Sequence, residues 1–356
     1  MKIHNYSAGP CILPKSVLQK ASEALVNYNG TGLSIAEMSH RSKDFVAVME
    51  NSVHLVKELL NVPEGYEVLF LQGGASMQFY MSALNFLPEK GTASYINTGT
   101  WSSKAIKEAK LIGNIKEIAS SKDKNFSYIP KVINYPHDSS FLHYTSNNTI
   151  FGTQFKETPK TNLRLVCDMS SDIMTQEIDI EKYDLIYAGA QKNIGPAGVT
   201  IVIVKKEALG KTGRIIPSML SYQIQIDKES MFNTPPCFNI YTSMLTLDWV
   251  KEMGGVKEMN KRNLEKSTLL YNEIDRNSLF EGTAKAEDRS VMNPTFILHN
   301  NSLNEVFLKK SIEAGINGIK GHRSVGGFRA SMYNALGIES VQVLVELMQE
   351  FEKTKG

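Results

Sequence analysis

Short apolar runs alternate with amphipathic stretches through the first two thirds of the chain. Residues 45–60 carry apolar side chains at helical spacing and stop before Pro63, which predicts a long helix. An earlier helix is predicted after Pro14, with an apolar face formed by Val17, Leu18, Ala21, Leu25 and Tyr28. Seven apolar runs predict buried strands, at residues 68–71, 93–97, 115–119, 141–145, 163–167, 185–187 and 199–204. Helical segments, including those predicted at about residues 77–86 and 102–112, separate most of these runs. The pattern therefore predicts an open, mostly parallel α/β sheet with helices on both faces.

The pattern changes after Pro235 and Pro236, where strands become fewer and shorter. The elements predicted beyond this point are helices over residues 240–253, 256–275, 304–314 and 339–353 and strands over 295–298 and 327–331. We therefore expect a large domain over residues 14–254. Residues 1–13 and 255–356 are expected to form a smaller α+β domain.

Composition and charge narrow the class of protein. A formal net charge of +2 over 356 residues gives no reason to expect nucleic acid or membrane partners. Cys11, Cys167 and Cys237 lie far apart without CxxC spacing, which argues against a disulfide framework or a metal site. The N-terminus lacks the continuous apolar core of a signal peptide, and no apolar run is long enough to span a bilayer. We expect a cytoplasmic protein.

A single lysine, Lys192, stands in the Gly-rich connection of residues 187–198, between two of the predicted strands. Small neighbours such as Gly189 and Gly195 allow a planar ligand or another backbone to approach closely. Desolvation at such a place lowers the pKa of a lysine and makes its amine a nucleophile toward carbonyl groups. Most lysines beside a glycine are surface turn residues, so the interpretation depends on partners elsewhere in the chain.

Ser76, Trp101, Asp168 and Lys192 all follow predicted strands, and the carboxyl ends of parallel strands form the ligand-binding edge of such sheets. The segment of residues 73–76, Gly-Gly-Ala-Ser, offers main-chain N–H groups and a hydroxyl to a phosphate. It matches neither a Walker A nor a GxGxxG motif, so ATP and NAD are not favoured. Asp168 can hold a ring nitrogen protonated, and Trp101 can stack on a flat ring.

Cationic residues complete this set. They are the pair His40 and Arg41, the pair His322 and Arg323, and Arg329 in a Gly-rich setting. Such groups bind carboxylates and phosphates, which indicates an anionic substrate. A nucleophilic lysine, a carboxylate, a phosphate cradle, a stacking indole and several cations together describe pyridoxal 5′-phosphate chemistry.

The segment of residues 187–198, Tyr-Ala-Gly-Ala-Gln-Lys-Asn-Ile-Gly-Pro-Ala-Gly, strongly resembles the phosphoserine aminotransferase family. These are class V pyridoxal-phosphate enzymes of fold type I. Further family-like segments span essentially the whole chain, at residues 7–10, 39–42, 230–236, 320–323 and 326–331.

The resemblance implies roles around the cofactor. Lys192 would bind the cofactor covalently and move a proton between the substrate Cα and the cofactor C4′ carbon. Asp168 would pair with the pyridinium nitrogen, Trp101 would stack on the ring, and Thr149 would lie near the ring hydroxyl. The residues implied to bind the cofactor phosphate are Ala75, Ser76 and Gln191.

The resemblance also implies a homodimer with shared active sites, in which Asn233 and Thr234 reach the phosphate of the second subunit and Arg41 crosses the interface. Arg329 would bind the substrate α-carboxylate. The residues implied to bind the distal phosphate or side-chain carboxylate are His40, Arg41, His322 and Arg323. Some family members carry an arginine where this chain has Ser76, so phosphate charge here has to be met by neutral donors and other cations.

The implied reaction is reversible transamination of 3-phosphohydroxypyruvate with L-glutamate, giving O-phospho-L-serine and 2-oxoglutarate in serine biosynthesis. The homologous four-carbon phospho-oxo acid, on the route to pyridoxal phosphate, is a further implied substrate. The alternatives are a cysteine desulfurase, a serine–pyruvate or alanine–glyoxylate aminotransferase, and a non-catalytic phosphate- or nucleotide-binding α/β protein. A desulfurase needs a mobile cysteine in the small domain, whereas Cys237 precedes that domain. The small substrates of serine–pyruvate and alanine–glyoxylate aminotransferases would leave both His-Arg pairs without a function.

Overall fold

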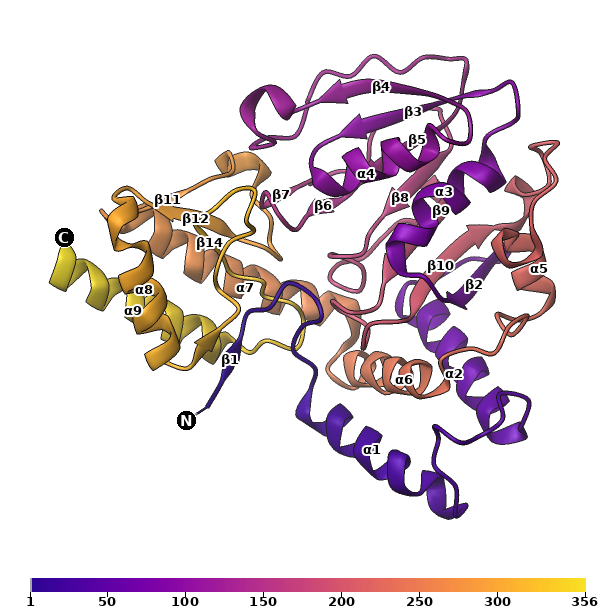
Figure 1. Cartoon of the computed structure of the whole chain (residues 1–356), viewed down its shortest axis with the longest axis horizontal. Coiled ribbons are helices and arrows are strands. Elements are labelled where there is room, and N and C mark those ends of the chain that lie inside the picture. The colour runs from indigo at the N-terminus through magenta and orange to yellow at the C-terminus, as the bar shows by residue number, and fades with distance from the viewer. Residues whose placement is uncertain (1) are drawn as a thin grey trace.

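A seven-stranded sheet forms the centre of the larger part of the protein in the computed structural model, which describes residues 2–356 (Figure 1). In spatial order its strands are β2 (Tyr66–Leu71), β10 (Thr200–Lys205), β9 (Tyr183–Gly189), β8 (Leu165–Asp168), β5 (Ser139–Thr145), β3 (Thr92–Asn97) and β4 (Asn114–Ser120). Only β10 runs antiparallel to its neighbours, and the other pairs are parallel. Each of the seven predicted strands falls in this sheet, so the predicted α/β fold class is confirmed.

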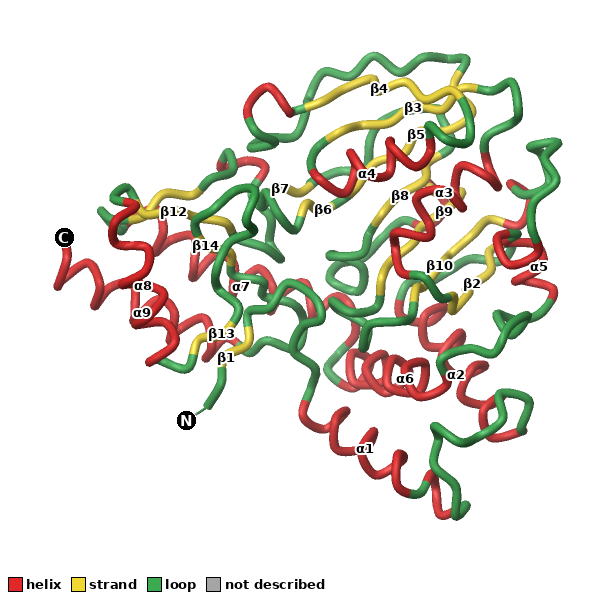
Figure 2. The backbone as a smooth tube through the Cα atoms, in the orientation of Figure 1, coloured by secondary structure: helices red, strands yellow, loops and turns green. Residues whose placement is uncertain are grey.

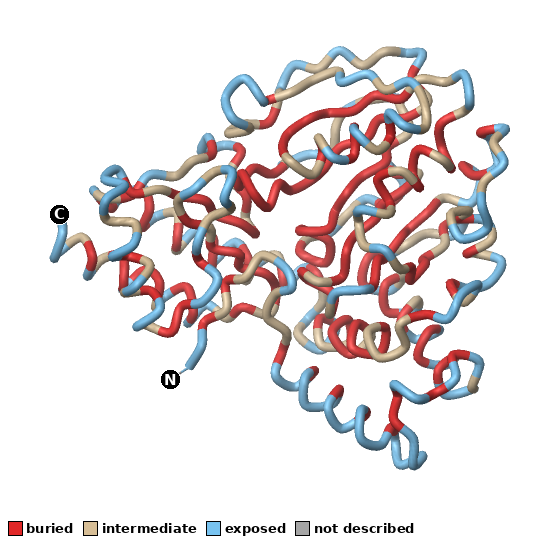
Figure 3. Tube along the Cα trace, viewed as in Figure 1, coloured by how far each residue is buried: buried red, intermediate tan, exposed pale blue. Residues whose placement is uncertain are grey.

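Helices cover both faces of the sheet because successive strand residues point to opposite sides. In β2, Val68 and Phe70 face one core, whereas Leu69 and Leu71 face another. The first core is closed by helices α1 (Lys15–Val26), α2 (Lys43–Leu59) and α6 (Cys237–Glu252). The second is closed by α3 (Gly74–Phe86), α4 (Thr100–Ala109) and α5 (Tyr222–Asp227). Six of the strands are accordingly buried along most of their length, whereas the edge strand β4 is exposed or half-buried throughout (Figure 3).

The apolar face predicted for the first helix is only partly correct. Helix α1 packs on α6 through buried Val17, Ala21 and Ala24. Leu18 and Leu25 remain 49% and 42% exposed in the single chain. A face that the sequence pattern assigns to the core therefore lies partly at the surface, where it is available to another molecule.

The remaining third of the chain builds a separate sheet beside the first (Figure 2). Strands β11 (Phe280–Gly282), β12 (Thr295–Leu298) and β14 (Phe328–Arg329) pair antiparallel. The accompanying helices are α7 (Gly255–Arg276), α8 (Asn304–Glu313) and α9 (Ile338–Lys355). Strand β1 (His4–Asn5) pairs with β13 (Ile316–Asn317), so the N-terminal arm lies with this part of the chain. The domain division at residue 254 stays a prediction, and the β1–β13 pairing supports it.

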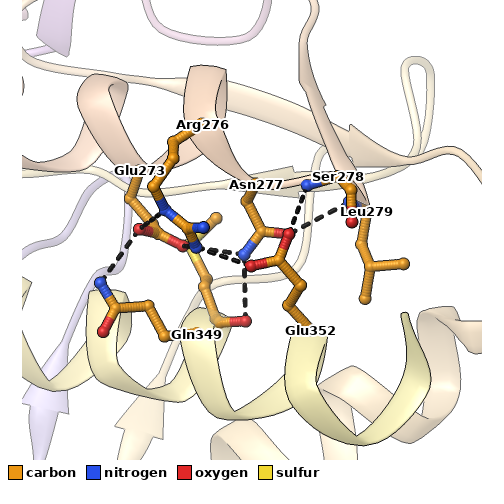
Figure 4. A network of polar contacts seen from close by, with 8 residues as sticks. Glu273, Arg276, Asn277, Ser278, Leu279, Gln349 and Glu352 are labelled. Carbon is orange, nitrogen blue, oxygen red and sulfur yellow. Dashed lines mark hydrogen bonds and ion pairs between the residues drawn. The ribbon is translucent and has the colours of Figure 1, made fainter.

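Helices α7 and α9 are joined by a polar network at their ends (Figure 4). The buried carboxylate of Glu273 accepts hydrogen bonds from Arg276 and from Gln349. Arg276 also donates to Glu352, 2.7 Å away, and Glu352 accepts the main-chain N–H of Ser278 at 2.6 Å. These bonds to the charged form lower the pKa of Glu352 to about 2. The network fixes the C-terminal helix against the helix that enters this part of the fold.

No helix of residues 2–356 combines the length and the apolar character that crossing a membrane would need.

Candidate active site

Lys192 lies in a tight connection between two paired strands. Gly189 and Thr200 are direct partners at the ends of β9 and β10, so the intervening loop leaves and re-enters the sheet at one point. The loop closes on itself through hydrogen bonds from the N–H groups of Lys192 and Gly195 to the carbonyl of Ala190, at 2.7 and 2.8 Å. A Cβ at Gly195 would come within 2.3 Å of the Ser243 hydroxyl oxygen on α6. The close approach of loop and helix therefore requires glycine here.

The amine of Lys192 is buried, with only 9% of the residue exposed, and Nζ donates to the Thr149 hydroxyl at 2.7 Å. Burial lowers the pKa of Lys192 to about 8, and Asp168 and Asp172 partly oppose this change. About a tenth of the Lys192 amines are therefore neutral at pH 7, far more than for an exposed lysine. This is the state that attacks carbonyl carbons and accepts protons.

Asp168 ends β8 at the same edge of the sheet and is also buried. Its Oδ1 accepts hydrogen bonds from the N–H and the hydroxyl of Ser170, at 2.9 and 2.6 Å. Within residues 2–356 no side chain or main-chain group donates to its second oxygen. Burial raises the pKa of Asp168, while the Ser170 bonds and the charge of Lys192 favour the carboxylate. One oxygen is thus fixed and the other is free to accept a hydrogen bond from a ligand.

Two helices begin earlier than the sequence predicts, and both contribute their first turns to the site. Helix α3 starts at Gly74 and α4 at Thr100, so Ala75, Ser76 and Trp101 lie in first turns. Gly73 reaches φ 86° ahead of α3, a left-handed conformation that favours glycine. The unpaired N–H groups and the dipole of such a helix end favour an anion.

A cavity of about 130 Å³ lies where these elements meet. Its lining consists of Gly74, Ala75, Ser76, Phe79, Trp101, Thr145, Asn147, Asp168, Ser170, Ser171, Gln191 and Lys192. The indole Nε1 of Trp101 and the hydroxyl of Thr145 are buried and have no hydrogen-bond partner within the described chain. The four residues expected at one edge of the sheet, Ser76, Trp101, Asp168 and Lys192, are therefore brought together around one cavity.

Cations from other elements lie near the residues of this cavity. Burial lowers the pKa values of Lys192 and His322, and the charge of Arg329 in β14 adds to both decreases. The Nε of Arg329 is buried without a partner in residues 2–356. His322 Nδ1 lies 2.7 Å from the Ser324 hydroxyl. Lys104, which the sequence analysis did not single out, places Nζ 4.7 Å from the centre of the Trp101 ring.

Eight predicted site residues lie outside the cavity lining of their own chain. Thr149 binds the Lys192 amine, and His322, exposed Arg323 and Arg329 lie near one another. The other four come from more distant parts of the chain. His40 is buried in the loop before α2, whereas Arg41 is exposed. Asn233 and Thr234 are exposed in the segment before α6, where the Thr234 carbonyl accepts from Gln72 at 2.8 Å. If the active site were formed by one chain alone, the side chains of His40, Arg41, Asn233 and Thr234 would have no ligand to bind.

Sequence reasoning missed several polar residues that shape the site. Ser170 positions Asp168, and Asn147 lines the cavity from β6 (Asn147–Asn148). Asp172 is a second buried carboxylate, held by Ser146 at 2.5 Å, and burial raises its pKa to about 6. The sequence feature that could have identified them is the run of small polar residues that follows the strands ending at Thr145 and Asp168.

Comparison with known proteins gives a consistent family. The family model for class-V aminotransferases matches residues 3–344. A phosphoserine aminotransferase of Flavobacterium psychrophilum is 60% identical over 353 residues, covering 99% of this chain and 99% of that protein. The Bacteroides fragilis phosphoserine aminotransferase is 56% identical over 355 residues, with 99% of each chain covered.

Comparison with solved structures gives the same family. The phosphoserine aminotransferase of Bacillus circulans subsp. alkalophilus has a TM-score of 0.97 at 44% identity, covering 100% of this chain and 99% of that one. A PLP-bound phosphoserine aminotransferase from Trichomonas vaginalis has a TM-score of 0.93 at 34% identity, covering 98% of this chain and 100% of that one. The chain belongs to the class-V aminotransferases and, within them, to the phosphoserine aminotransferase family.

Proposed function

We propose that this protein catalyses reversible transamination of 3-phosphohydroxypyruvate with L-glutamate, giving O-phospho-L-serine and 2-oxoglutarate, with pyridoxal 5′-phosphate as cofactor. The observation that carries the proposal is the buried amine of Lys192 in a cavity shared with Asp168 and the N-terminus of α3. Family membership and the names of relatives at 56–60% identity support the same reaction. Activity on the homologous four-carbon phospho-oxo acid stays a prediction.

The residues present fit pyridoxal phosphate. The free oxygen of Asp168 suits the ring N–H, and the α3 N-terminus with Ser76 suits the phosphate. The Trp101 ring lies 6.0 Å from Lys192 Nζ, so it can cover a ring attached to that nitrogen. The unpartnered hydroxyl of Thr145 offers a further hydrogen bond to a ligand in the cavity. We propose that Asn233 and Thr234 add to this site from a second subunit.

Pyridoxal phosphate supplies a carbonyl carbon that takes up the amino group and a ring that withdraws electrons from the substrate Cα. Lys192 would hold this group covalently, and its neutral Nζ, once free, would move the proton at the substrate Cα. Thr149, 2.7 Å away, keeps Nζ oriented. Asp168 would accept a hydrogen bond from the ring N–H and so keep the ring nitrogen protonated. The buried position of both groups excludes water and strengthens this charge interaction.

Replacing Arg329 by alanine is expected to raise KM for L-glutamate about 10- to 100-fold while kcat changes little, because a hydrogen-bonded contact to a charged carboxylate is lost. The buried, unpartnered Nε of Arg329 is the observation behind this prediction. Steady-state kinetics at varied glutamate test it. Arg329→Lys keeps the charge but loses the planar guanidinium, so its KM for L-glutamate should lie between those of the wild type and Arg329→Ala. A KM that stays at the wild-type value in Arg329→Ala would remove Arg329 from the substrate site.

We further propose that the protein works as a homodimer with shared sites in the cytoplasm. Two observations support the shared sites. Arg41, Asn233 and Thr234 are exposed and lie away from the cavity of their own chain. Large apolar side chains are exposed on and after α1, including Leu18, Leu25, Val26 and Leu33. Such a surface suits a second copy of the chain.

Shared sites predict a specific complementation. Neither Lys192→Ala nor Arg41→Ala homodimers should turn over at an appreciable rate. A hybrid dimer of the two variants contains one site with both changes and one site with neither. Purified through two different affinity tags, the hybrid should therefore recover about half of the wild-type activity. A hybrid as inactive as both parents would show that Arg41 acts within its own chain or outside the site.

The visible absorption spectrum of the reconstituted protein tests the proposed reaction. O-Phospho-L-serine alone should bleach the band of Lys192-bound pyridoxal phosphate, and 2-oxoglutarate should restore it. L-Alanine and L-serine serve as controls for the serine–pyruvate and alanine–glyoxylate alternatives. A coloured protein that ignores phosphoserine but responds to alanine would favour those alternatives, and failure to bind the cofactor would favour a non-catalytic protein.

The positions of the cysteines weigh against a desulfurase. Cys11 donates to the main-chain oxygen of Lys192 at 2.5 Å, and burial raises its pKa to about 12, so it is not a thiolate nucleophile. Cys167 is buried in β8, and Cys237 begins α6. None of the three lies in the part of the chain after residue 254.

A further inference from the structure

Lys266 in the middle of α7 is an ionisable side chain for which the proposed reaction has no role. The residue is only 2% exposed. Its Nζ donates hydrogen bonds to the main-chain oxygens of Met332, Tyr333 and Leu336, at 3.0, 2.9 and 3.0 Å. Across residues 2–356 no carboxylate forms an ion pair with it. Three carbonyl dipoles therefore take the place of a counter-ion.

The buried charge of Lys266 is costly in itself. Burial lowers the pKa of Lys266 to about 7, and Arg262, one turn earlier on α7, adds to the decrease. Only Glu339 in the first turn of α9 opposes it. An apolar side chain of similar length would avoid the cost of desolvating a charge, but it would leave the three carbonyls without a donor. The role of Lys266 therefore lies with the carbonyls that it binds.

These carbonyls belong to the connection between β14 and α9. Residues 330–337 contain neither helix nor strand, yet most of them are buried. Buried main-chain oxygens outside regular structure need donors from elsewhere. An ammonium group has three N–H bonds, one for each of the three carbonyls. A neutral amine has only two and would turn its lone pair toward the third.

The same connection contacts the loop that carries the reactive lysine. The N–H of Asn334 donates to Asn193 Oδ1 at 3.1 Å, and Asn193 directly follows Lys192. The side chain of Asn334 donates to the Met174 carbonyl at 2.8 Å and accepts from Asn263 of α7 at 2.8 Å. Asn334 is therefore fixed from several sides in contact with the Lys192 loop.

Two further contacts connect this segment to the site. The hydroxyl of Tyr333 donates to the carbonyl of Ala8 at 2.9 Å, and the neighbouring Gly9 packs on Gln191 and Lys192. Arg329 lies three residues before Met332, at the end of β14. A shift of the connection would thus reach the substrate-binding arginine and the lysine loop together.

We propose that Lys266 is a positioning residue whose ammonium group holds residues 332–336 in the conformation that fixes Arg329 and the Lys192 loop. Its effect on catalysis rests on the function proposed above, whereas its effect on the connection does not. The two are therefore measured separately.

The first test compares Lys266→Met with Lys261→Met, an exposed lysine on the same helix. Hydrogen–deuterium exchange of the full-length protein without added substrate should show residues 332–336 exchanging at least about tenfold faster in Lys266→Met. The exchange of strand β9 should be unchanged, and Lys261→Met should show wild-type exchange in every segment. In kinetics, Lys266→Met should raise KM for L-glutamate several-fold as well as lower kcat. A lowered melting temperature with unchanged exchange of residues 332–336 and unchanged KM would overturn the proposal.

A second test needs no variant and holds even if Lys266→Met does not fold. The protection of residues 332–336, corrected for intrinsic exchange, should fall as the pH rises from 6 to 9, because Lys266 then loses the proton that serves the third carbonyl. The other groups facing it are the guanidinium of Arg262, the carboxylate of Glu339 and the hydroxyl of Tyr333. A hydrogen bond from Lys2 lowers the pKa of Glu339 and burial raises the pKa of Tyr333, so neither of these two titrates over this range. If the protection of residues 332–336 were as independent of pH as the protection of β9, the role of the ammonium would be overturned. A wild-type protein without transaminase activity would refute the proposed function and leave both exchange results intact.

Discussion

Replacing Lys192 by alanine is expected to lower the rate of transamination at least about 1000-fold, the loss that accompanies removal of both a covalent nucleophile and a proton-transfer group. Nζ of Lys192 is the only amine lining the cavity within the described chain, and its pKa of about 8 is suited to accepting a proton near neutral pH. The visible band of the bound cofactor should disappear as well. Stopped-flow mixing with O-phospho-L-serine measures the rate.

The matched control is Lys90→Ala, an exposed lysine in the turn before β3, which should keep wild-type kinetics. Thermal unfolding of both variants establishes that the active-site change leaves the fold intact. Lys192 contacts Thr149 and little else that is polar, so its loss should cost about 1 kcal/mol of stability. A Lys192→Ala protein that turns over within tenfold of the wild type would contradict both the site and the proposed reaction.

Asp168→Asn is expected to lower kcat about 100- to 1000-fold with little change in substrate KM, the range seen when a group that stabilises transition-state charge is removed. Ser170 donates twice to Oδ1, and the asparagine oxygen can keep both bonds. The amide NH₂ then points into the cavity, where it meets a ring nitrogen as a donor. It therefore favours the unprotonated ring, which withdraws electrons less strongly.

Asp172→Asn provides a control at equal burial, because Asp172 does not line the cavity. It accepts from Ser146 and from Gln154, so its amide loses one acceptor and should cost about 1 kcal/mol of stability. Its kcat should stay within about tenfold of the wild type. Equal losses in the two variants would mean that the carboxylates matter for packing and not for the charge of the ring.

Much of the site followed from periodicity, since strand ends are visible in the sequence. The apolar runs before Asp168 and before the Lys192 loop both end in small or polar residues, and the sheet brings such ends to one edge. The first turns of α3 and α4 were harder to predict. Gly74 and Trp101 are poor markers of a helix start, so the predicted helices began two or three residues too late.

Other parts depend on contacts that no local pattern contains. Strands β6 and β7 (Thr153–Gln154) are two residues each and rich in Asn and Gln, which gives no strand signal. Lys266 lies on the buried face of α7, but a lysine at one helical position looks like a surface residue until its three carbonyl partners are known. The half-exposed Leu18 and Leu25 show the converse, an apolar pattern whose covering surface is not in the same chain.

The position of β2 has a consequence for biosynthesis on the ribosome. This edge strand, Tyr66–Leu71, has β10 as its hydrogen-bonded neighbour in the sheet, and Leu71 pairs with Thr200. At about 5–20 residues per second, translation leaves the strand without its partner for on the order of ten seconds. Its sequence, Tyr-Glu-Val-Leu-Phe-Leu, has a high β-propensity and a single charge, the type of segment that pairs with other nascent chains. A chaperone that shields this strand should therefore raise the yield of native protein more than one that acts after release.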